Sequence, residues 1–262
     1  MRALIQFLPA LALSFFCSVA LATPQQLLAD FQHMRLSATN AVTNFYMFSG
    51  LDADSKYERR IDISMKKFAD AMTSAEQLGS ASGMGDEVSA IGTDWKKLSE
   101  LMTLNRADML KQGFPNVRLV DEMGRLSTEI VNKASAAYDL LQERSGIKPG
   151  PVVQKTRHLA LLMEEITSQY AARGTSNLGQ VFMGNYDRTL TEMAEEFQKI
   201  LNDLSTQVES AQTDVLMNSI HSKWRFMEER IRNYNESTVP FLVVSYNDRI
   251  IEHLEELEAM FR

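Results

Sequence analysis

Cysteine is almost absent from this sequence. The 262 residues include a single cysteine, Cys17, which lies in an apolar N-terminal segment. The bulky residues Phe15 and Phe16 stand directly before it, where lipoprotein processing requires small side chains. Once this segment is removed, no thiol remains, which excludes disulfides, thiolate metal sites and covalent haem attachment. The stability of the chain must therefore come from packing.

The sequence also lacks the short motifs that identify common enzymes. It has no Gly-x-Ser-x-Gly, no phosphate-binding loop, no His-Glu-x-x-His and no dinucleotide fingerprint. Formal net charge is -7, which disfavours nucleic acid and anionic lipid surfaces as partners. We therefore expect a non-enzymatic protein without a cofactor and without a nucleic-acid partner.

Metal-binding patterns are missing as well. The four histidines fall on different expected helices, and no two are four residues apart: His33, His158, His221 and His253. Only Asp30 precedes a histidine by three residues, whereas a di-iron bundle needs Glu-x-x-His on two helices. Asp52-Ala-Asp54 opens like a calcium loop but lacks glycine at the sixth position and has Ile63 at the twelfth. No metal site is predicted.

The N-terminus has the features of an export signal. Residues 1–22 combine Arg2, an apolar run from Leu4 to Leu21, and an Ala20-Leu21-Ala22 cleavage pattern. This combination predicts a secretory signal peptide and a periplasmic mature protein, with no membrane span after cleavage. An uncleaved membrane anchor is the alternative, since the run is nearly long enough to span.

The remaining chain predicts an all-α fold. Apolar residues recur at spacings of three and four, and proline is rare after residue 24. Period-two strands are nearly absent. The spacing predicts helices over 25–48, 56–79, 86–112, 117–145, 152–173, 178–209, 213–235 and 240–260.

An internal repeat divides these helices into two groups of four. A shift of 129 residues pairs three aromatic positions, including the two tryptophans of the chain: Tyr57 with Tyr186, Phe68 with Phe197, and Trp95 with Trp224. Upstream, a shift of 124 pairs Tyr46 with Tyr170 and Gly50 with Gly174. The expected architecture is two tandem antiparallel four-helix bundles that arose by duplication.

A linker rich in glycine and proline separates the two copies. It predicts a first half at 23–146, a linker at 147–151 and a second half at 152–262.

One segment suggests ligand binding. Arg173 and Gly174 stand at an expected helix end, where a guanidinium could bind a small planar anion with the help of the next helix N-terminus. Helix termination is the alternative, because glycine favours the C-cap conformation and arginine offsets the helix dipole.

The sequence Arg173-Gly174-Thr175-Ser176, followed by Tyr186-Asp187-Arg188 and a long amphipathic helix, resembles nitrate- and nitrite-sensing domains and the related pilus-chemoreceptor sensor domain. The resemblance implies an extracytoplasmic sensory bundle, in the nitrate sensor a duplicated pair, with Arg173, Gly174 and Arg188 as candidate anion-binding residues. In the first half, the aligned dipeptide is Ser49-Gly50, so the arginine is not repeated.

Two functions follow from these observations. The first is a periplasmic helical module for signalling or small-anion sensing, which would act through an envelope or membrane-receptor protein because no output domain follows Arg262. The second is a structural or adaptor protein that binds another protein's helix, for which 15 methionines offer adaptable apolar contacts.

Overall fold

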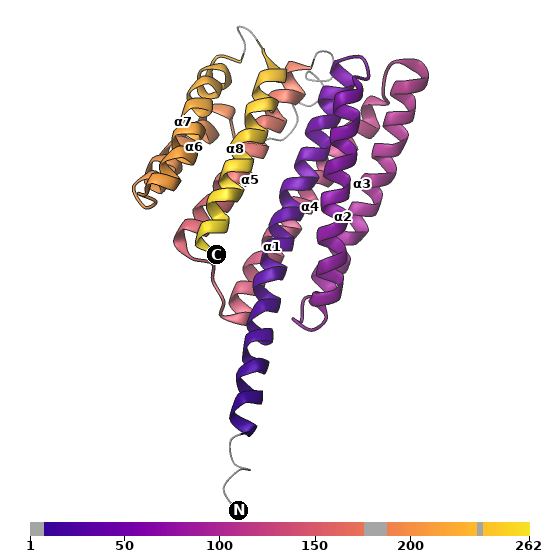
Figure 1. Ribbon diagram of the computed structural model, residues 1–262. Coiled ribbons are helices and arrows are strands. Elements are labelled where there is room, and N and C mark those ends of the chain that lie inside the picture. The colour runs from indigo at the N-terminus through magenta and orange to yellow at the C-terminus, as the bar shows by residue number, and fades with distance from the viewer. Residues whose placement is uncertain (1–7, 176–187, 235–237) are drawn as a thin grey trace, which may run out of the picture.

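The protein is all-helical in the part of the chain that the structure describes. The computed structural model describes residues 8–175, 188–234 and 238–262, with side chains from residue 24 onward, and no strand occurs among them. The expected all-α fold is confirmed. Successive helices run up and down, with both termini near the same end of the molecule (Figure 1).

The first four helices follow the sequence expectation closely except at the start of the first, which begins 17 residues earlier than predicted. They are α1 (Leu8–Gly50), α2 (Ser55–Gly79), α3 (Gly85–Gln112) and α4 (Val117–Ser145). Helix α1 contacts α2 and α4, and α3 contacts α2 and α4, so each helix has two neighbours in this group. The N-terminal part of α1 extends beyond the other helices (Figure 1).

The last four helices repeat this arrangement. They are α5 (Pro151–Gly174), α6 (Leu190–Ser205), α7 (Ala211–Arg232) and α8 (Pro240–Phe261). Helix α5 contacts α6 and α8, and α7 contacts α6 and α8. The predicted linker coincides with the break between α4 and α5, where Gly146 has a φ of 69° that L side chains rarely adopt.

Helix α6 begins later than its apolar spacing predicts. Arg188 and Thr189 are not helical, while residues 178–187 lie outside the described part of the chain. Thr189 caps the helix: its hydroxyl accepts a hydrogen bond from the Glu192 amide at 3.2 Å, and the Glu192 carboxylate accepts one from the Thr189 amide at 2.8 Å. This capping box satisfies amides that the first turn leaves without helical partners.

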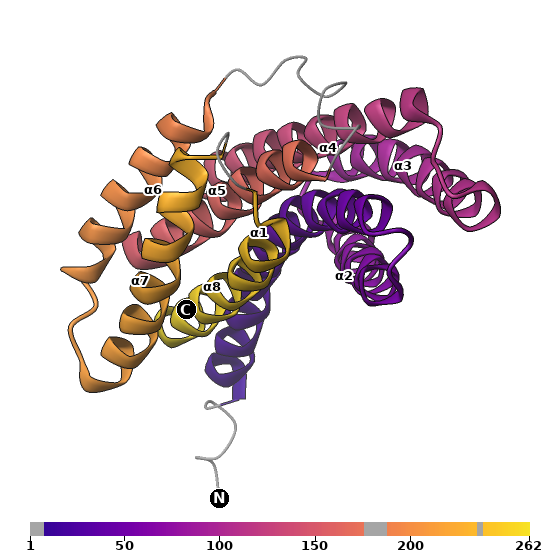
Figure 2. The same cartoon turned by 90° about the horizontal axis from the view of Figure 1, so that it is seen from above.

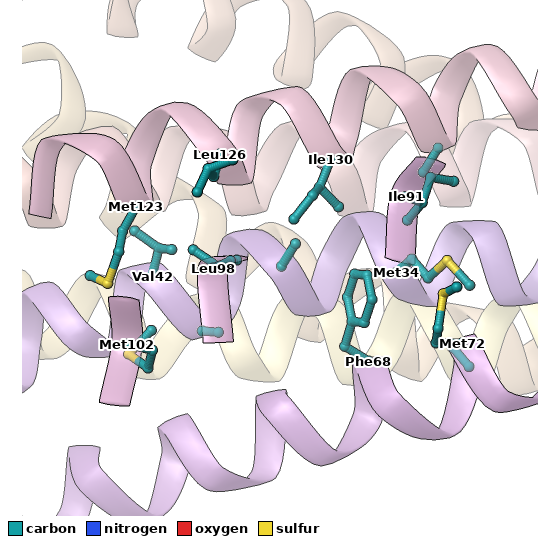
Figure 3. Packing of buried hydrophobic residues seen from close by; sticks show 14 of the residues in the cluster. Met34, Val42, Phe68, Met72, Ile91, Leu98, Met102, Met123, Leu126 and Ile130 are labelled. Atoms are coloured by element: carbon teal, nitrogen blue, oxygen red, sulfur yellow. The ribbon is translucent and has the colours of Figure 1, made fainter. Parts of the chain in front are cut away.

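Each group of helices has its own apolar core. In the first, methionines and aliphatic residues of α1 to α4 interdigitate around Phe68 (Figure 3). In the second, Phe197 and Trp224 pack with aliphatic residues of α5 to α8. Each amphipathic helix thereby buries the stripe that its sequence predicts.

The residues paired by the repeat occupy matching places. The Phe68 and Trp95 rings stack with centroids 3.7 Å apart, and those of Phe197 and Trp224 lie 4.1 Å apart. Tyr57 is buried. Its counterpart Tyr186 lies outside the described residues.

The upstream pairs also match. Tyr46 and Tyr170 are both buried, and Gly50 and Gly174 are the last residues of α1 and α5. A side chain at either glycine would collide with a neighbour: an added Cβ would lie 2.3 Å from the Thr175 Cβ or 2.5 Å from the Pro240 Cγ.

The two groups of helices meet along α1 and α5. Seen from above, α1 lies between α2 on one side and α8 on the other (Figure 2). This junction joins equivalent helices of the two groups, and a groove opens beside it.

The predicted signal peptide falls mostly outside the described side chains. Residues 1–7 are not described, and residues 8–22 are known only as backbone of α1. Within the described part of the chain, no helix combines the length and the apolar character needed to cross a membrane.

Candidate functional site

A groove of about 930 Å³ lies between α1, α2 and α8. Glu164 on α5 forms part of its lining. Residues from Gln26 to Asn40 of α1 line it, a stretch that corresponds to about 21 Å along a helix axis. It is therefore long and narrow and lies at the junction of the two helix groups.

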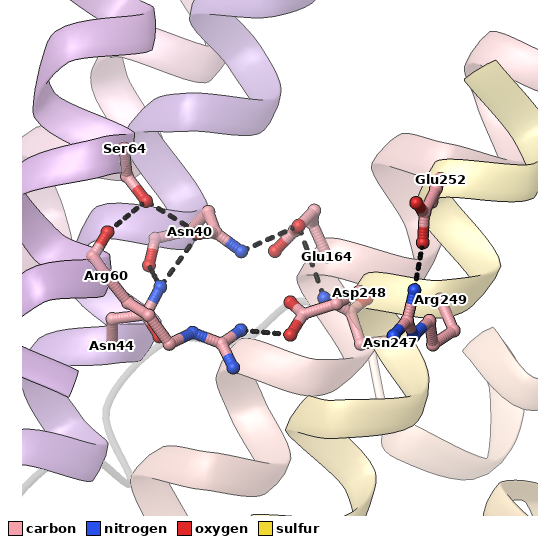
Figure 4. A network of polar contacts seen from close by, with 9 residues as sticks. All are labelled: Asn40, Asn44, Arg60, Ser64, Glu164, Asn247, Asp248, Arg249 and Glu252. Atoms are coloured by element: carbon pink, nitrogen blue, oxygen red, sulfur yellow. Dashed lines mark hydrogen bonds and ion pairs between the residues drawn. The ribbon is translucent and has the colours of Figure 1, made fainter. Parts of the chain in front are cut away.

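A hydrogen-bonded network lies at the end of this groove that is lined by Asn40, Ser64 and Glu164 (Figure 4). The Glu164 Oε1 accepts a hydrogen bond from the Asn40 amide nitrogen at 2.9 Å and one from the Asn247 amide nitrogen at 3.2 Å. The Asn40 Oδ1 in turn accepts from the Ser64 hydroxyl at 2.7 Å and from the Asn44 amide at 2.8 Å. Four helices thus contribute to one polar cluster.

Glu164 is the exceptional member of this network. The residue is 3% exposed, and its Oε2 has no hydrogen-bond partner among the described residues. Burial, together with the nearby Asp248 carboxylate, raises the pKa of the Glu164 carboxyl to about 8. The carboxyl is therefore largely protonated at neutral pH.

An ion pair crosses the same end of the groove. The Arg60 guanidinium on α2 donates to the Asp248 carboxylate on α8, and this contact links the two helix groups (Figure 4). Burial raises the pKa of Asp248, although Arg60 acts in the opposite direction. The pair holds Asp248 beside Glu164.

The end of the groove around Asp30 is also polar. The Asp30 carboxylate on α1 accepts hydrogen bonds from the Ser74 hydroxyl at 2.7 Å and from the Gln26 amide at 2.9 Å. His33 lines the groove one turn further along α1, and burial lowers its pKa. Glu255 on α8 faces the same region and favours the charged form of His33.

A second polar cluster lies deeper at the junction. Arg157 on α5 donates to the Glu258 carboxylate at 2.8 Å and to the Tyr138 hydroxyl at 3.1 Å. The Arg35 guanidinium on α1 lies 4.5 Å from the centre of the same Tyr138 ring. Burial lowers the pKa of Arg35 to about 10. The contacts between the helix groups are thus substantially polar.

The structure places the three predicted anion-binding residues in different contacts. Arg173 lies over the Tyr234 ring, 4.9 Å from its centre, and Arg188 forms an ion pair with Glu196. Gly174 lines a separate cavity of about 300 Å³ beside Pro240. The Arg188 guanidinium already donates a hydrogen bond to the Glu196 carboxylate.

The groove lining is polar along its length. Among the described residues, no group of three histidine, cysteine, aspartate or glutamate side chains could hold a metal ion. The groove offers carboxylates, amides and hydroxyls along its length, which recognise a polar molecule by charge and hydrogen bonding.

Motif searching missed the residues of the groove, although the sequence contained one indication of them. Asn40, Asn44 and Glu164 are among several polar residues on the buried sides of α1 and α5. Polar residues at such positions require partners when buried. The pairing of Asn40 with Glu164 across 124 residues could not be known before the fold.

Comparison with known proteins gives no further assignment. No protein-family model, curated protein or solved structure matches this chain.

Proposed function

We propose that this chain is an exported, non-enzymatic sensor that binds a small molecule in the groove and signals through a partner protein of the periplasm or membrane. The observation that carries the proposal is the groove itself. It is large enough for a metabolite and contains a buried carboxylate oxygen without a partner. Such an oxygen is costly to bury unless something binds it.

The proposed architecture is a duplicated pair of antiparallel four-helix bundles. The closed set of contacts within each group of four helices supports it, as does the matching of the two Phe–Trp pairs. A further match extends to the last helix of each group, where a shift of 120 residues places the buried Ile130, Ala134 and Ala137 on the buried Ile250, Leu254 and Leu257.

Signal transmission would occur at the junction of these bundles. The groove has walls from both groups, α1 and α2 on one side and α8 on the other. A ligand that binds between them would favour one relative position of the two groups over another. The polar contacts Arg60–Asp248 and Asn40–Glu164 can exchange with ligand or water at lower cost than a dry apolar interface.

The same geometry places the proposed ligand away from Arg173. Groove carboxyl groups outnumber its cations, so a small anion is disfavoured there. Anion sensing would instead require Arg173 or Arg188, whose guanidinium groups already contact Tyr234 and Glu196. We therefore propose the groove as the primary binding site.

Titration calorimetry tests this proposal. The panel is nitrate, nitrite, small dicarboxylates, linear amines and polyols, applied to the parent protein, Glu164→Gln and Arg173→Ala. Loss of heat in Glu164→Gln with retention in Arg173→Ala supports the groove. The reverse pattern would identify Arg173 as the site, and no heat from any compound would contradict a sensor function.

An adaptor function is the second candidate, supported by exposed apolar side chains at one end of the molecule. The turns that follow α1 and α3 and the beginning of α8 lie at the same end (Figure 1). They expose Leu51, Phe114 and Phe241, with exposed fractions of 41%, 62% and 50%. A protein recovered from envelope extract by the parent chain and lost with Phe114→Ser, while Glu164→Gln has no effect, would favour this function.

A further inference from the structure

The charge and shape of the groove point to the class of molecule that it binds. We infer that the groove accepts a linear organic cation carrying two or more amines, with one ammonium group at Glu164 and another near Asp30 and Glu255. This inference rests on the proposed ligand-binding function and specifies its ligand.

The charge balance of the lining favours a cation. Six carboxyl groups line the groove against two permanently cationic side chains, Arg60 and Lys67; the carboxyl groups belong to Asp30, Asp70, Glu164, Asp248, Glu252 and Glu255. Asp248 already neutralises Arg60. Lys67 is exposed at the rim, where water screens its charge. Asp70 and Glu252 are exposed as well and pair with Lys66 and Arg249. Glu164 is largely protonated in the free protein, so Asp30 and Glu255 are the carboxylates left to attract a cation into the groove.

A buried carboxyl oxygen without a partner marks the binding point at Glu164. Both asparagine contacts of Glu164 go to its Oε1, and the Oε2 is left without a hydrogen-bond partner although the residue is 3% exposed. Once the carboxyl is ionised, an ammonium group would supply both a donor for this oxygen and the opposite charge. The carboxyl would lose its proton when the ammonium binds, because its pKa is about 8 in the free protein.

The distance between the acidic ends requires an elongated molecule. Glu164 bonds to Asn40, whereas Asp30 lies ten residues earlier on the same helix, a separation of about 15 Å along its axis. His33 and Glu255 also line the groove. A single compact amine would satisfy only one end, so a chain with nitrogens at both ends fits better.

Calorimetry with spermidine tests the inference. The shorter 1,4-diaminobutane, which cannot reach both acidic ends, tests the length requirement, with 1,4-butanediol and succinate as its neutral and anionic comparators. We expect spermidine to bind, the short diamine to bind severalfold more weakly, the diol at least tenfold more weakly than spermidine, and succinate not to bind. Amine binding should release a proton, which appears as a heat that changes with the ionisation enthalpy of the buffer.

Three variants localise the effect. Glu164→Gln preserves the acceptor for Asn40 and Asn247 but cannot ionise, and should weaken amine binding about tenfold or more and abolish the proton release. Glu255→Gln should weaken it severalfold. Glu256→Gln, one residue further on α8 and outside the groove lining, is the matched control and should leave it unchanged.

The outcomes separate this inference from the proposed function. Binding of the diol or succinate in the groove, lost with Glu164→Gln, would overturn the amine inference and leave the sensor proposal intact. Amine binding that is equally weakened by Glu255→Gln and Glu256→Gln would show nonspecific attraction to an acidic surface and would also overturn the inference. Absence of binding by every compound in both panels would contradict both proposals.

Discussion

The two Phe–Trp pairs of the molecule differ in their surroundings. Phe68 and Trp95 stack nearly parallel, at 11° between ring planes, and Trp95 remains partly exposed. Phe197 and Trp224 meet at 38°, Trp224 is 1% exposed, and its indole nitrogen donates a hydrogen bond to Gln198 at 2.8 Å. The second group thus encloses its tryptophan, although its α6 is shorter than α2. The two pairs thus share a ring contact but differ in how much of the tryptophan is buried, and therefore in how much we expect it to stabilise the fold.

The largest expected effect follows from this difference in burial. Trp224→Ala removes a fully buried ring and its hydrogen bond, and should lower the free energy of unfolding by about 3–5 kcal/mol. Trp95→Ala should lower it by only about 1–2 kcal/mol, because part of the ring already faces water. Urea denaturation followed by circular dichroism measures both. Equal losses would show that the two environments are energetically alike.

The second test compares Glu164 of α5 with Asn40, its counterpart on α1. Since burial raises the folded-state pKa of Glu164 to about 8 from an ordinary 4.5, the folded protein holds this proton more tightly than the unfolded chain. Stability should therefore fall as pH rises from about 4.5 to 8. Glu164→Gln, which makes the position uncharged like Asn40, should match the parent at pH 4 and exceed its stability by about 3 kcal/mol at pH 7.

Denaturation midpoints recorded across this pH range provide the measurement. Glu256→Gln serves as the control, since this exposed carboxyl on α8 should leave the shape of the profile unchanged. Parallel profiles for the parent and Glu164→Gln would contradict a buried carboxyl with a raised pKa.

The third test concerns the glycines that end α1 and α5. Gly50→Ala would place a methyl group 2.3 Å from the Thr175 Cβ, and Gly174→Ala would place one 2.5 Å from the Pro240 Cγ. Each should cost about 2 kcal/mol, since neither neighbour is the end of a flexible side chain. Gly85→Ala has no atom within 3.4 Å and should change stability by less than about 0.5 kcal/mol. A tolerated alanine at Gly50 alone would show that the two helix ends are not equivalent.

The smallest effect compares the caps of α2 and α6. The Asp54 side chain accepts one hydrogen bond, from the Lys56 amide at 2.8 Å, whereas Thr189 takes part in a reciprocal capping box with Glu192. Alanine at either position should cost about 1 kcal/mol, with the larger loss at Thr189. Thermal denaturation resolves the two, and a larger loss at Asp54 would reverse the expected order.

The positions of the helices could be predicted from the sequence because the information is local. Apolar spacing and the glycine- and proline-rich breaks around Gly146 and Pro151 set six of the eight starts to within about a residue or two of the described helices, the exceptions being α6 and α1, which is helical from Leu8. Helix α6 differs because its apolar spacing carries on upstream of Thr189, and only the capping geometry shows where the described helix begins. Anion binding at Arg173 and Arg188 stays a prediction.

The sequence alone therefore determined the all-α character and the matching of Phe68 with Phe197 and Trp95 with Trp224, because amphipathic period and rare residues are visible along the chain. Only the tertiary structure decided that Asn40 meets Glu164 and that Arg60 meets Asp248. These contacts depend on how α1 packs against α5 and how α2 faces α8. The burial and the pKa of a side chain depend on its packed environment. The sequence therefore does not mark these residues, and they line a groove only when the two helix groups pack together.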